Sequence, residues 1–382
     1  MHLTRQEEKI YDGEFGWAYE TSMKILVRLG DLFDATRLIP IKSAHISGVS
    51  YKTLGDAPID FLKALVENKA KVRVPSTLNP SSFDPYYMTN RITPEQMEKQ
   101  TQILALYKQM GVTPALTCTP YYLQPFRADW HLAWAESSAV MYANSVLKAW
   151  TNREGSPSAL AAALIGKTPN YGMHQPGNRQ ASIRIKMETA LKTETDYGVL
   201  GVHVGKIVKD KIPVFEGLPK NASGEDLKFL GAGLASSGMT SMFHYKPAKL
   251  PRLETVSIGK KEMEAALEGL SVVSEKPNLV CMGCPHCSFN EVKTIAKSLH
   301  GRRVQKELWV CTSRFVREKA AESVKVIEKA GGHVLCDTCA VVTWLREPIM
   351  TNSAKCAYYM PTMNKANAVL APLNECIKAA TS

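Results

Sequence analysis

The first part of the chain alternates between stretches with helically spaced apolar positions and short apolar runs that end in polar turns. Residues 93–111 begin with Thr93-Pro-Glu-Gln96, a helix-start signature, and continue with apolar residues at helical spacing. Short apolar runs at residues 36–41, 71–74 and 113–117 predict strands, and the last of them leads to Cys118. This alternation of helices and strands predicts layered α/β structure.

The middle of the chain is harder to interpret from its pattern. Residues 128–150 are mostly helical in pattern, whereas residues 152–178 are rich in turn formers and predict a functional loop or a linker. Residues 178–249 carry mixed signals, and no helix or strand can be assigned there from the sequence pattern. A strand at residues 253–259 and a helix starting at Lys260 follow.

The last third has the clearest pattern. Apolar runs at residues 278–281, 307–311 and 333–339 predict strands, with amphipathic helices after Ser288 and at residues 315–330 between them. Short joints between such elements imply parallel strands with right-handed crossovers. In sheets of this kind, ligands collect beyond the carboxyl ends of the strands.

The predicted fold class is therefore α/β, with mostly parallel sheets flanked by helices. We expect three lobes: residues 1–150 with Cys118, residues 151–270 with uncertain elements, and residues 271–382 with Cys284 and Cys339. A chain of 382 residues, 45% of them hydrophobic, is ample for such cores.

Composition narrows the possible partners. The chain contains no run of about 18 apolar residues and begins without an apolar signal segment, so we expect a cytoplasmic protein that does not enter a membrane. The net charge of +11 is scattered rather than gathered into a stripe interleaved with aromatic residues. This favours a small anionic ligand over nucleic acid, and a lysine-rich solvated surface is the simplest explanation.

The nine cysteines are the main chemical signal. Cys281, Cys284 and Cys287 have the spacing of a ferredoxin cluster run but lack its fourth Cys-Pro, and a second C-x-x-C pair ends at Cys339. The two groups lie roughly fifty residues apart, which exceeds the usual spacing of structural zinc sites. Neither pair opens a helix as a thioredoxin-like redox pair does. An electron-carrying cluster, structural zinc and a catalytic cluster therefore stay open at this point.

A cluster held by three protein cysteines would leave one iron open, and an open iron is a Lewis acid that can assist loss of a hydroxyl group as water. Polar turns at residues 47–50, 76–82, 136–138 and 351–355 could supply contacts to an anionic substrate.

Eight segments, distributed over nearly the whole chain, resemble the large subunits of the aconitase X family, in its archaeal branch. They are Gly48-Val-Ser-Tyr51, Ser76-Thr-Leu-Asn-Pro80, Cys118-Thr-Pro-Tyr121, Ala133-Trp-Ala-Glu-Ser-Ser-Ala-Val140, Thr151-Asn-Arg-Glu-Gly155, Gly283-Cys-Pro-His286, Asp337-Thr-Cys339 and Thr351-Asn-Ser-Ala-Lys355. The segment Cys284-Pro-His-Cys-Ser-Phe-Asn-Glu291 is more distantly similar to the first cluster-cysteine segment of ordinary aconitase-type dehydratases.

The resemblance implies an aconitase-like multi-lobe architecture with a cluster site between lobes. It also implies a hydro-lyase that converts (R)-5-phosphomevalonate to trans-anhydromevalonate 5-phosphate in an archaeal route to isoprenoids. The implied cofactor is a [4Fe–4S] cluster. The implied partner is a small swivelling subunit in a heterodimer, and the catalytic base is expected on that subunit.

The resemblance further implies the site residues. The expected iron ligands are Cys118, Cys284 and Cys339; a rival set replaces Cys118 with Cys336, and Cys281 and Cys287 are lesser candidates. The expected substrate contacts are Gly48, Val49, Ser50, Asn79, Pro80, Glu136, Ser137, Ser353, Ala354 and Lys355.

Three histidines, His45, His174 and His286, could serve as acid or base, although a lone histidine is more often a structural hydrogen-bonding group. The alternative functions are a dehydratase of another small hydroxy acid, of the 3-hydroxyproline type, and an iron–sulfur electron carrier.

Overall fold

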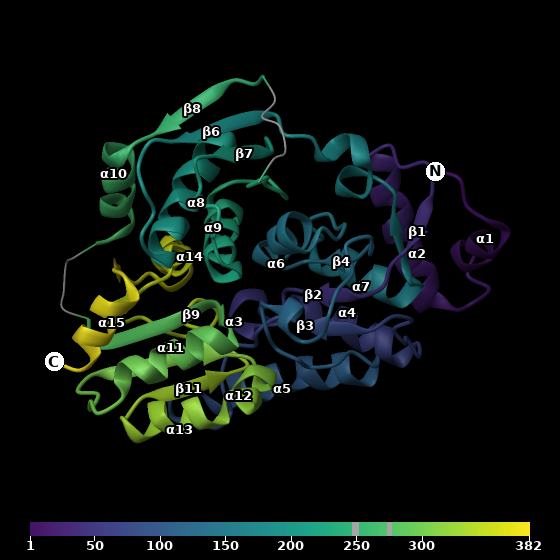
Figure 1. Ribbon diagram of the computed structural model, residues 1–382. Coiled ribbons are helices and arrows are strands. Elements are labelled where there is room, and N and C mark those ends of the chain that lie inside the picture. Colours follow the sequence, from purple (N-terminus) through teal and green to yellow (C-terminus); the bar gives the residue numbers. More distant parts are fainter. Residues whose placement is uncertain (247–251, 273–276) are drawn as a thin grey trace.

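The computed structural model describes residues 1–246, 252–272 and 277–382 and arranges them as three α/β lobes (Figure 1). Each lobe has its own parallel sheet with helices packed against it. Among the described residues, no helix has the length and apolar character needed to cross a membrane.

The N-terminal lobe is built on the parallel sheet β3-β2-β4, and a second small sheet pairs β1 with β5. Its apolar core includes Ile46, Leu62 and Ile103. Its strands and α-helices are α1 (Arg5–Tyr11), α2 (Trp17–Leu32), β1 (Leu38–Pro40), β2 (Ala44–Ile46), α3 (Tyr51–Leu54), α4 (Ala57–Glu67), β3 (Ser76–Leu78), α5 (Pro94–Gln109), β4 (Ala133–Trp134), α6 (Ser137–Tyr142), α7 (Ser156–Ile165) and β5 (Lys167–Pro169). Short 3₁₀ turns are η1 (Thr89–Arg91), η2 (Pro120–Tyr122), η4 (Gly172–His174) and η5 (Pro176–Arg179), and η3 (Ala143–Leu147) is a π-helical turn.

The middle lobe has the parallel sheet β7-β6-β8. Its elements are β6 (Ile183–Met187), α8 (Glu194–Val208), β7 (Pro213–Glu216), α9 (Gly224–Ser237), β8 (Thr255–Ile258) and α10 (Lys260–Leu270). Helices α8 and α9 approach so closely that a Cβ atom on Gly201 would lie 2.3 Å from the carbonyl oxygen of Leu230. Glycine is therefore required at this crossing.

The C-terminal lobe has the parallel sheet β11-β10-β9-β12-β13. The pattern of the last third predicts β9, β10 and β11 as parallel strands but does not predict β12 and β13. Its elements are β9 (Leu279–Cys287), α11 (Phe289–Leu299), β10 (Glu307–Thr312), α12 (Arg314–Lys319), α13 (Ala321–Lys329), β11 (His333–Cys336), β12 (Ile349–Thr351), α14 (Ala354–Tyr359), the π-helical turn η6 (Met360–Asn364), β13 (Ala368–Leu370) and α15 (Leu373–Ala380).

Several local predictions are wrong, and backbone hydrogen bonding explains one of them. Residues 71–74 form no strand, because the N–H groups of Val72 and Arg73 donate to the carbonyl oxygens of Met110 and Ala163; the strand lies at Ser76–Leu78 instead. Residues 113–117 make only an isolated bridge at Thr113.

The predicted loop at residues 152–178 contains the buried helix α7, whose alanine-rich sequence begins after Gly155 with Pro157 in its first turn. Residues 128–150 combine the short strand β4 with α6. The helix predicted at residues 315–330 is divided into α12 and α13 at Ala320. Residues 178–249, where the sequence pattern predicts no helix or strand, contain α8 and α9. Both helices begin with capping boxes, at Thr193 and Ser223.

Candidate active site

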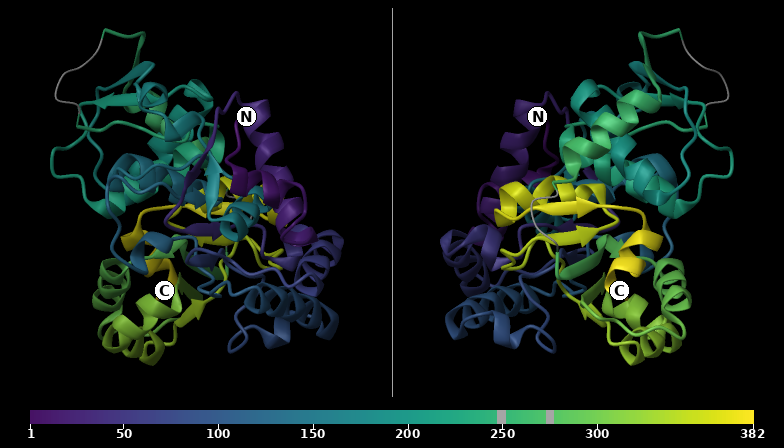
Figure 2. Two further views of the ribbon diagram at one scale, coloured as in Figure 1. Left: turned by 90° about the vertical axis from the view of Figure 1, so that its right-hand side faces the viewer. Right: turned by 90° about the vertical axis from the view of Figure 1, so that its left-hand side faces the viewer.

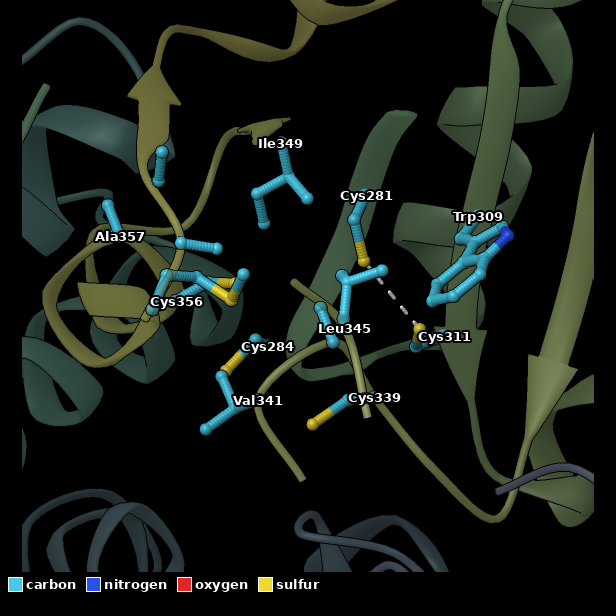
Figure 3. Close-up of a cluster of buried hydrophobic side chains, with 14 of the residues drawn as sticks. Cys281, Cys284, Trp309, Cys311, Cys339, Val341, Leu345, Ile349, Cys356 and Ala357 are labelled. Carbon is cyan, nitrogen blue, oxygen red and sulfur yellow. Dashed lines mark hydrogen bonds between the residues drawn. The ribbon is translucent and has the colours of Figure 1, made fainter. Parts of the chain in front are cut away.

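Three buried cysteines from three distant segments line one cavity of about 270 Å³ between the N-terminal and C-terminal lobes. Cys118 precedes η2, Cys284 lies in β9, and Cys339 follows β11. Cys284 and Cys339 belong to one cluster of buried side chains, which Figure 3 shows. The cavity is completed by Asn79, Pro80, Glu136, Ser137, Val341, Val342, Lys355, Tyr359 and Met363.

A bulge in β9 turns Cys284 out of the sheet. Met282 pairs with Val310 and Cys287 with Thr312, so four residues of β9 stand opposite the single residue Cys311. Within this bulge Gly283 has φ = 98°, and a Cβ atom there would lie 2.1 Å from the carbonyl oxygen of Cys311. Only glycine fits this position, which accounts for the residue that precedes Cys284. The Cys284–Pro285 peptide bond is cis.

His286 links the three cysteine segments. Its backbone N–H donates to the sulfur of Cys118 at 3.1 Å. Its ring Nε2 lies 3.0 Å from the carbonyl oxygen of Thr338, beside Cys339, and its Nδ1 lies 3.1 Å from the hydroxyl of Thr117, beside Cys118. Because a carbonyl oxygen only accepts, Nε2 carries the proton and Nδ1 accepts from Thr117.

This arrangement assigns His286 a positioning role. Burial lowers the pKa of His286 to about 4, so the ring is neutral near pH 7, and both ring nitrogens already have partners. His286 therefore has no free nitrogen with which to act as acid or base.

The Cys118 sulfur has one feature of a metal-bound thiolate, because it accepts a hydrogen bond from the backbone N–H of His286 at 3.1 Å. Near Cys339, the backbone N–H of Val342 donates to the carbonyl oxygen of Cys339 at 3.2 Å. Burial raises the pKa of Cys118 to about 12, so without a cation the thiols are protonated. Thiolate donors with N–H groups aimed at sulfur suit zinc, copper(I) or iron–sulfur clusters.

Across residues 1–246, 252–272 and 277–382, no three His, Cys, Asp or Glu side chains are grouped closely enough to hold a single metal ion. The other cysteines proposed as ligands lie away from the cavity wall. Cys281 contacts Cys311 with a sulfur–sulfur distance of 3.9 Å (Figure 3). The backbone N–H of Cys336 donates to Asp84, and Cys287 lines a separate cavity.

The charged wall of the cavity is a buried ion pair between the lobes. The Nζ of Lys355, at the start of α14, donates to Oε1 of Glu136 at 2.6 Å, and Nδ2 of Asn79 donates to Oε2 at 2.8 Å. Burial raises the pKa of Glu136, but Lys355 and the hydrogen bonds outweigh it and lower the pKa to about 2. For Lys355, burial lowers the pKa, and Glu136 more than compensates, so the lysine stays charged.

The other predicted substrate contacts lie behind the wall rather than in it. Ser50 donates its hydroxyl to the carbonyl oxygen of Val342 at 2.8 Å, and Ser353 caps α14 and donates to the carbonyl oxygen of Cys284. Ala354 is fully buried, as is Val49, whose carbonyl accepts from Gln100 at 3.0 Å. Gly48 has φ = 67° in the turn before α3. Direct contact of these five residues with a ligand stays a prediction.

The two remaining histidines are structural in their surroundings. His45 lies between the Thr77 hydroxyl at 2.8 Å and Asn79 Oδ1 at 3.3 Å, and burial lowers its pKa to about 4. His174 contacts His131 through their Nδ1 atoms at 2.9 Å, and it does not line the cavity.

Sequence reasoning missed several residues at the cavity. Tyr359 stands four positions after Lys355 on α14, so helical spacing could have identified it. Val341 and Val342 directly follow the Cys339 turn. Lys52 of α3 donates to the carbonyl oxygen of Val341 at 3.0 Å; burial lowers its pKa to about 8. No pattern in the sequence distinguishes Lys52 from other lysines.

Comparison with known families covers nearly the whole chain. Three family models match in order: the aconitase X first domain at residues 1–176, its second domain at residues 181–268 and its third domain at residues 277–382. These ranges do not test the predicted divisions at residues 150 and 270, which stay predictions.

Similar curated proteins span the same length. The phosphomevalonate dehydratase large subunit of Methanocaldococcus jannaschii is 43% identical, over 99% of this chain and 100% of that protein. That of Methanosarcina mazei is 42% identical, over 100% of this chain and 97% of that protein. The cis-3-hydroxy-L-proline dehydratase of Pseudomonas aeruginosa is 33% identical, over 98% of this chain and 69% of that protein. A crystal structure of Thermococcus kodakaraensis aconitase X in its holo form superposes with a TM-score of 0.93 at 42% identity and covers all of both chains.

Proposed function

The chain belongs to the aconitase X family, and from this premise we propose that it is the large subunit of a phosphomevalonate dehydratase. The observation that carries the proposal is full-length identity of about 43% to archaeal large subunits of that name, against 33% to a hydroxyproline dehydratase. The enzyme is a hydro-lyase. Its substrate is (R)-5-phosphomevalonate, and its product is trans-anhydromevalonate 5-phosphate.

The family suggests an iron–sulfur cofactor, and the three cavity thiols fit one. Cys118, Cys284 and Cys339 are the residues that would hold it, because all three line one cavity and the sulfur of Cys118 accepts the backbone N–H of His286. Within this class of cofactor we propose a [4Fe–4S] cluster, the type that the family resemblance of the cysteine segments implies. When bound by three cysteines, such a cluster supplies an open iron that acts as a Lewis acid toward a hydroxyl group.

The chain's own residues bind and orient the substrate. In the reaction a C–OH bond and the C–H bond next to the carboxylate break, a C=C bond forms and water leaves. Lys355 and Asn79, fixed on Glu136, present N–H donors at the cavity wall that suit a carboxylate. Pro80, Val341 and Val342 form an apolar wall that limits access of bulk water.

The proton acceptor is expected on the small subunit. Among the described residues that line the cavity, Glu136 is the one carboxylate, and its two oxygens accept from Lys355, Ser138 and Asn79. Neither His45 nor His286 has a free ring nitrogen. Because Glu136, His45 and His286 are committed to these contacts, we expect the base on the small subunit.

Anaerobic assays of the purified chain, alone and with a small subunit of the same family, test this proposal. We expect dehydration of (R)-5-phosphomevalonate only with both chains, and no dehydration of cis-3-hydroxy-L-proline. Full activity of the large subunit alone would contradict the assignment of the base. Turnover of hydroxyproline in place of phosphomevalonate would contradict the assignment of the substrate.

A further inference from the structure

The proposed substrate carries more negative charge than the cavity wall can balance. It has a carboxylate at one end and a phosphate at the other, whereas Lys355 is the one Lys, Arg or His among the described residues that line the cavity. Lys355 is already paired with Glu136 at 2.6 Å. The substrate therefore needs a second cation near the cavity, and the inference that follows rests on the proposed function.

Lys52 is placed to supply that cation. It belongs to α3, which follows the turn at residues 48–50, and its Nζ donates to the carbonyl oxygen of Val341 at 3.0 Å. Val341 and Val342 are part of the cavity wall, and Ser50 reaches the same segment through its hydroxyl at 2.8 Å. The ammonium group of Lys52 thus lies one hydrogen bond away from the cavity wall.

The positive charge on Lys52 is available to bind an anionic ligand. Among the described residues, no carboxylate lies within ion-pair distance of Lys52, although its side chain is about half buried. By contrast, Lys99 near the same end of the lobe is paired with Asp56 at 2.8 Å. An ammonium group has three donors, and the Val341 carbonyl uses one, so two stay available for phosphate oxygens.

Other cations near the cavity are committed elsewhere. The guanidinium of Arg153 donates to the carbonyl oxygens of Gly238 and Ala235 in the middle lobe. Buried Lys228 is bound to Glu291 and to the carbonyl oxygen of His286. A half-buried lysine without a carboxylate partner is costly to keep charged, and an anionic ligand would offset that cost.

We propose that Lys52 binds the phosphate group of the substrate, while Lys355 serves the carboxylate. Lys52 is then the residue that separates phosphorylated substrates from unphosphorylated ones. This places the substrate across the cavity, with its two anionic ends toward different lobes.

The test compares Lys52→Met, Lys52→Arg and the control Lys325→Met, which removes the same charge from the exposed helix α13. With the assembled two-subunit enzyme, Lys52→Met should raise KM for phosphomevalonate about ten- to hundredfold, as expected for loss of one charge-assisted hydrogen bond. We expect kcat to change less than about threefold, and Lys52→Arg to recover part of the loss. Iron content and visible spectrum should match the wild type, and Lys325→Met should behave as the wild type.

A second arm measures binding of inorganic phosphate to the large subunit by calorimetry, and it does not depend on turnover. If the wild type does not dehydrate phosphomevalonate, the proposed function fails, whereas weaker phosphate binding by Lys52→Met still supports the phosphate site. The phosphate-site proposal would be overturned if Lys52→Met bound phosphate as tightly as the wild type, or if the wild type bound no phosphate. Loss of iron in Lys52→Met would also overturn it, because Lys52 would then act only by holding the Cys339 turn.

Discussion

At the scale of single residues, the hydrogen bonds of His286 connect the segments that carry the three cavity cysteines. His286 donates its backbone N–H to Cys118 and places its ring between Thr117 and Thr338, each next to a proposed iron ligand. The buried pair of Glu136 and Lys355 then fixes the charged wall of the same cavity. The neutral imidazole of His286 positions the cysteine segments, whereas the Glu136–Lys355 ion pair faces the cavity in which the ligand would bind.

Single Cys→Ser substitutions at positions 118, 284 and 339 should each lower iron content severely in anaerobically purified protein. The reason is that each removes a soft thiolate from the cavity. Iron analysis and the visible spectrum measure the effect. Cys376→Ser serves as the control, because Cys376 is buried in α15 away from the cavity. Full iron in Cys118→Ser together with loss in Cys336→Ser would show the rival ligand set to be correct.

Replacing Glu136 by Gln should destabilise the fold by about 3–5 kcal/mol at pH 7, because it leaves Lys355 buried without its counter-ion. The folded-state pKa of Glu136 is lowered to about 2, below its usual 4.5. The stabilisation is therefore fully present above pH 4.5 and is lost as the pH falls toward 2.

Denaturant unfolding followed by circular dichroism at pH 7, 5 and 3 should show the gap between wild type and Glu136→Gln narrowing at low pH. Glu264→Gln, which changes an exposed residue of α10, should have little effect. A gap that is small at pH 7 or independent of pH would contradict a buried, ionised Glu136.

At the scale of elements, the bulge in β9 converts a buried parallel strand into a ligand-bearing turn. The sequence pattern predicts β9, β10 and β11, whose apolar runs are separated by helices, and α11 and α12 begin with side-chain caps at Ser288 and Ser313. It does not predict β12, the other neighbour of β9. The bulge itself depends on the backbone of β10, which is distant in sequence, so only Gly283 indicates it locally.

Gly283→Ala should destabilise the protein by about 2–4 kcal/mol, because a side chain there would meet the Cys311 carbonyl in a left-handed backbone conformation. Thermal or denaturant unfolding measures the change, and iron content should fall with it as Cys284 moves. Gly269→Ala in α10 is the control: its Cβ meets nothing within 4 Å, and alanine favours helices, so stability should be unchanged or slightly raised. Equal stability of the two variants would show that the bulge tolerates a side chain.

At the scale of the whole molecule, the cavity is shared between the outer lobes and supported by the middle one. Glu136 and Cys118 come from the N-terminal lobe, and Lys355 comes from α14, which packs against α8 and α9 of the middle lobe (Figure 2). Buried Lys228 of α9 joins Glu291 and the carbonyl oxygen of His286. The lobes therefore hold one another and the site in a single arrangement.

The sequence predicts correctly those features of the fold and the site that depend on interactions between residues close in the chain. Capping boxes at Thr93 and Ser288 act within four residues, so the helices they begin were predictable. The convergence of Cys118 with Cys284 was suggested by family resemblance rather than by spacing, since the two lie in different lobes. The wall residues Tyr359 and Val342 lie within four residues of the predicted site residues Lys355 and Cys339, so local spacing could have identified them. The place of Lys52 beside the cavity depends on long-range packing, for which a single sequence gives no signal.

The most direct test of the central claim is an anaerobic visible and electron paramagnetic resonance titration of the purified, iron-loaded chain with (R)-5-phosphomevalonate. An iron–sulfur cluster with an open iron in the cavity of Cys118, Cys284 and Cys339 should give a spectrum that changes saturably with substrate and not with cis-3-hydroxy-L-proline. An iron spectrum that phosphomevalonate leaves unchanged would contradict this account and indicate a fully ligated, electron-carrying cluster.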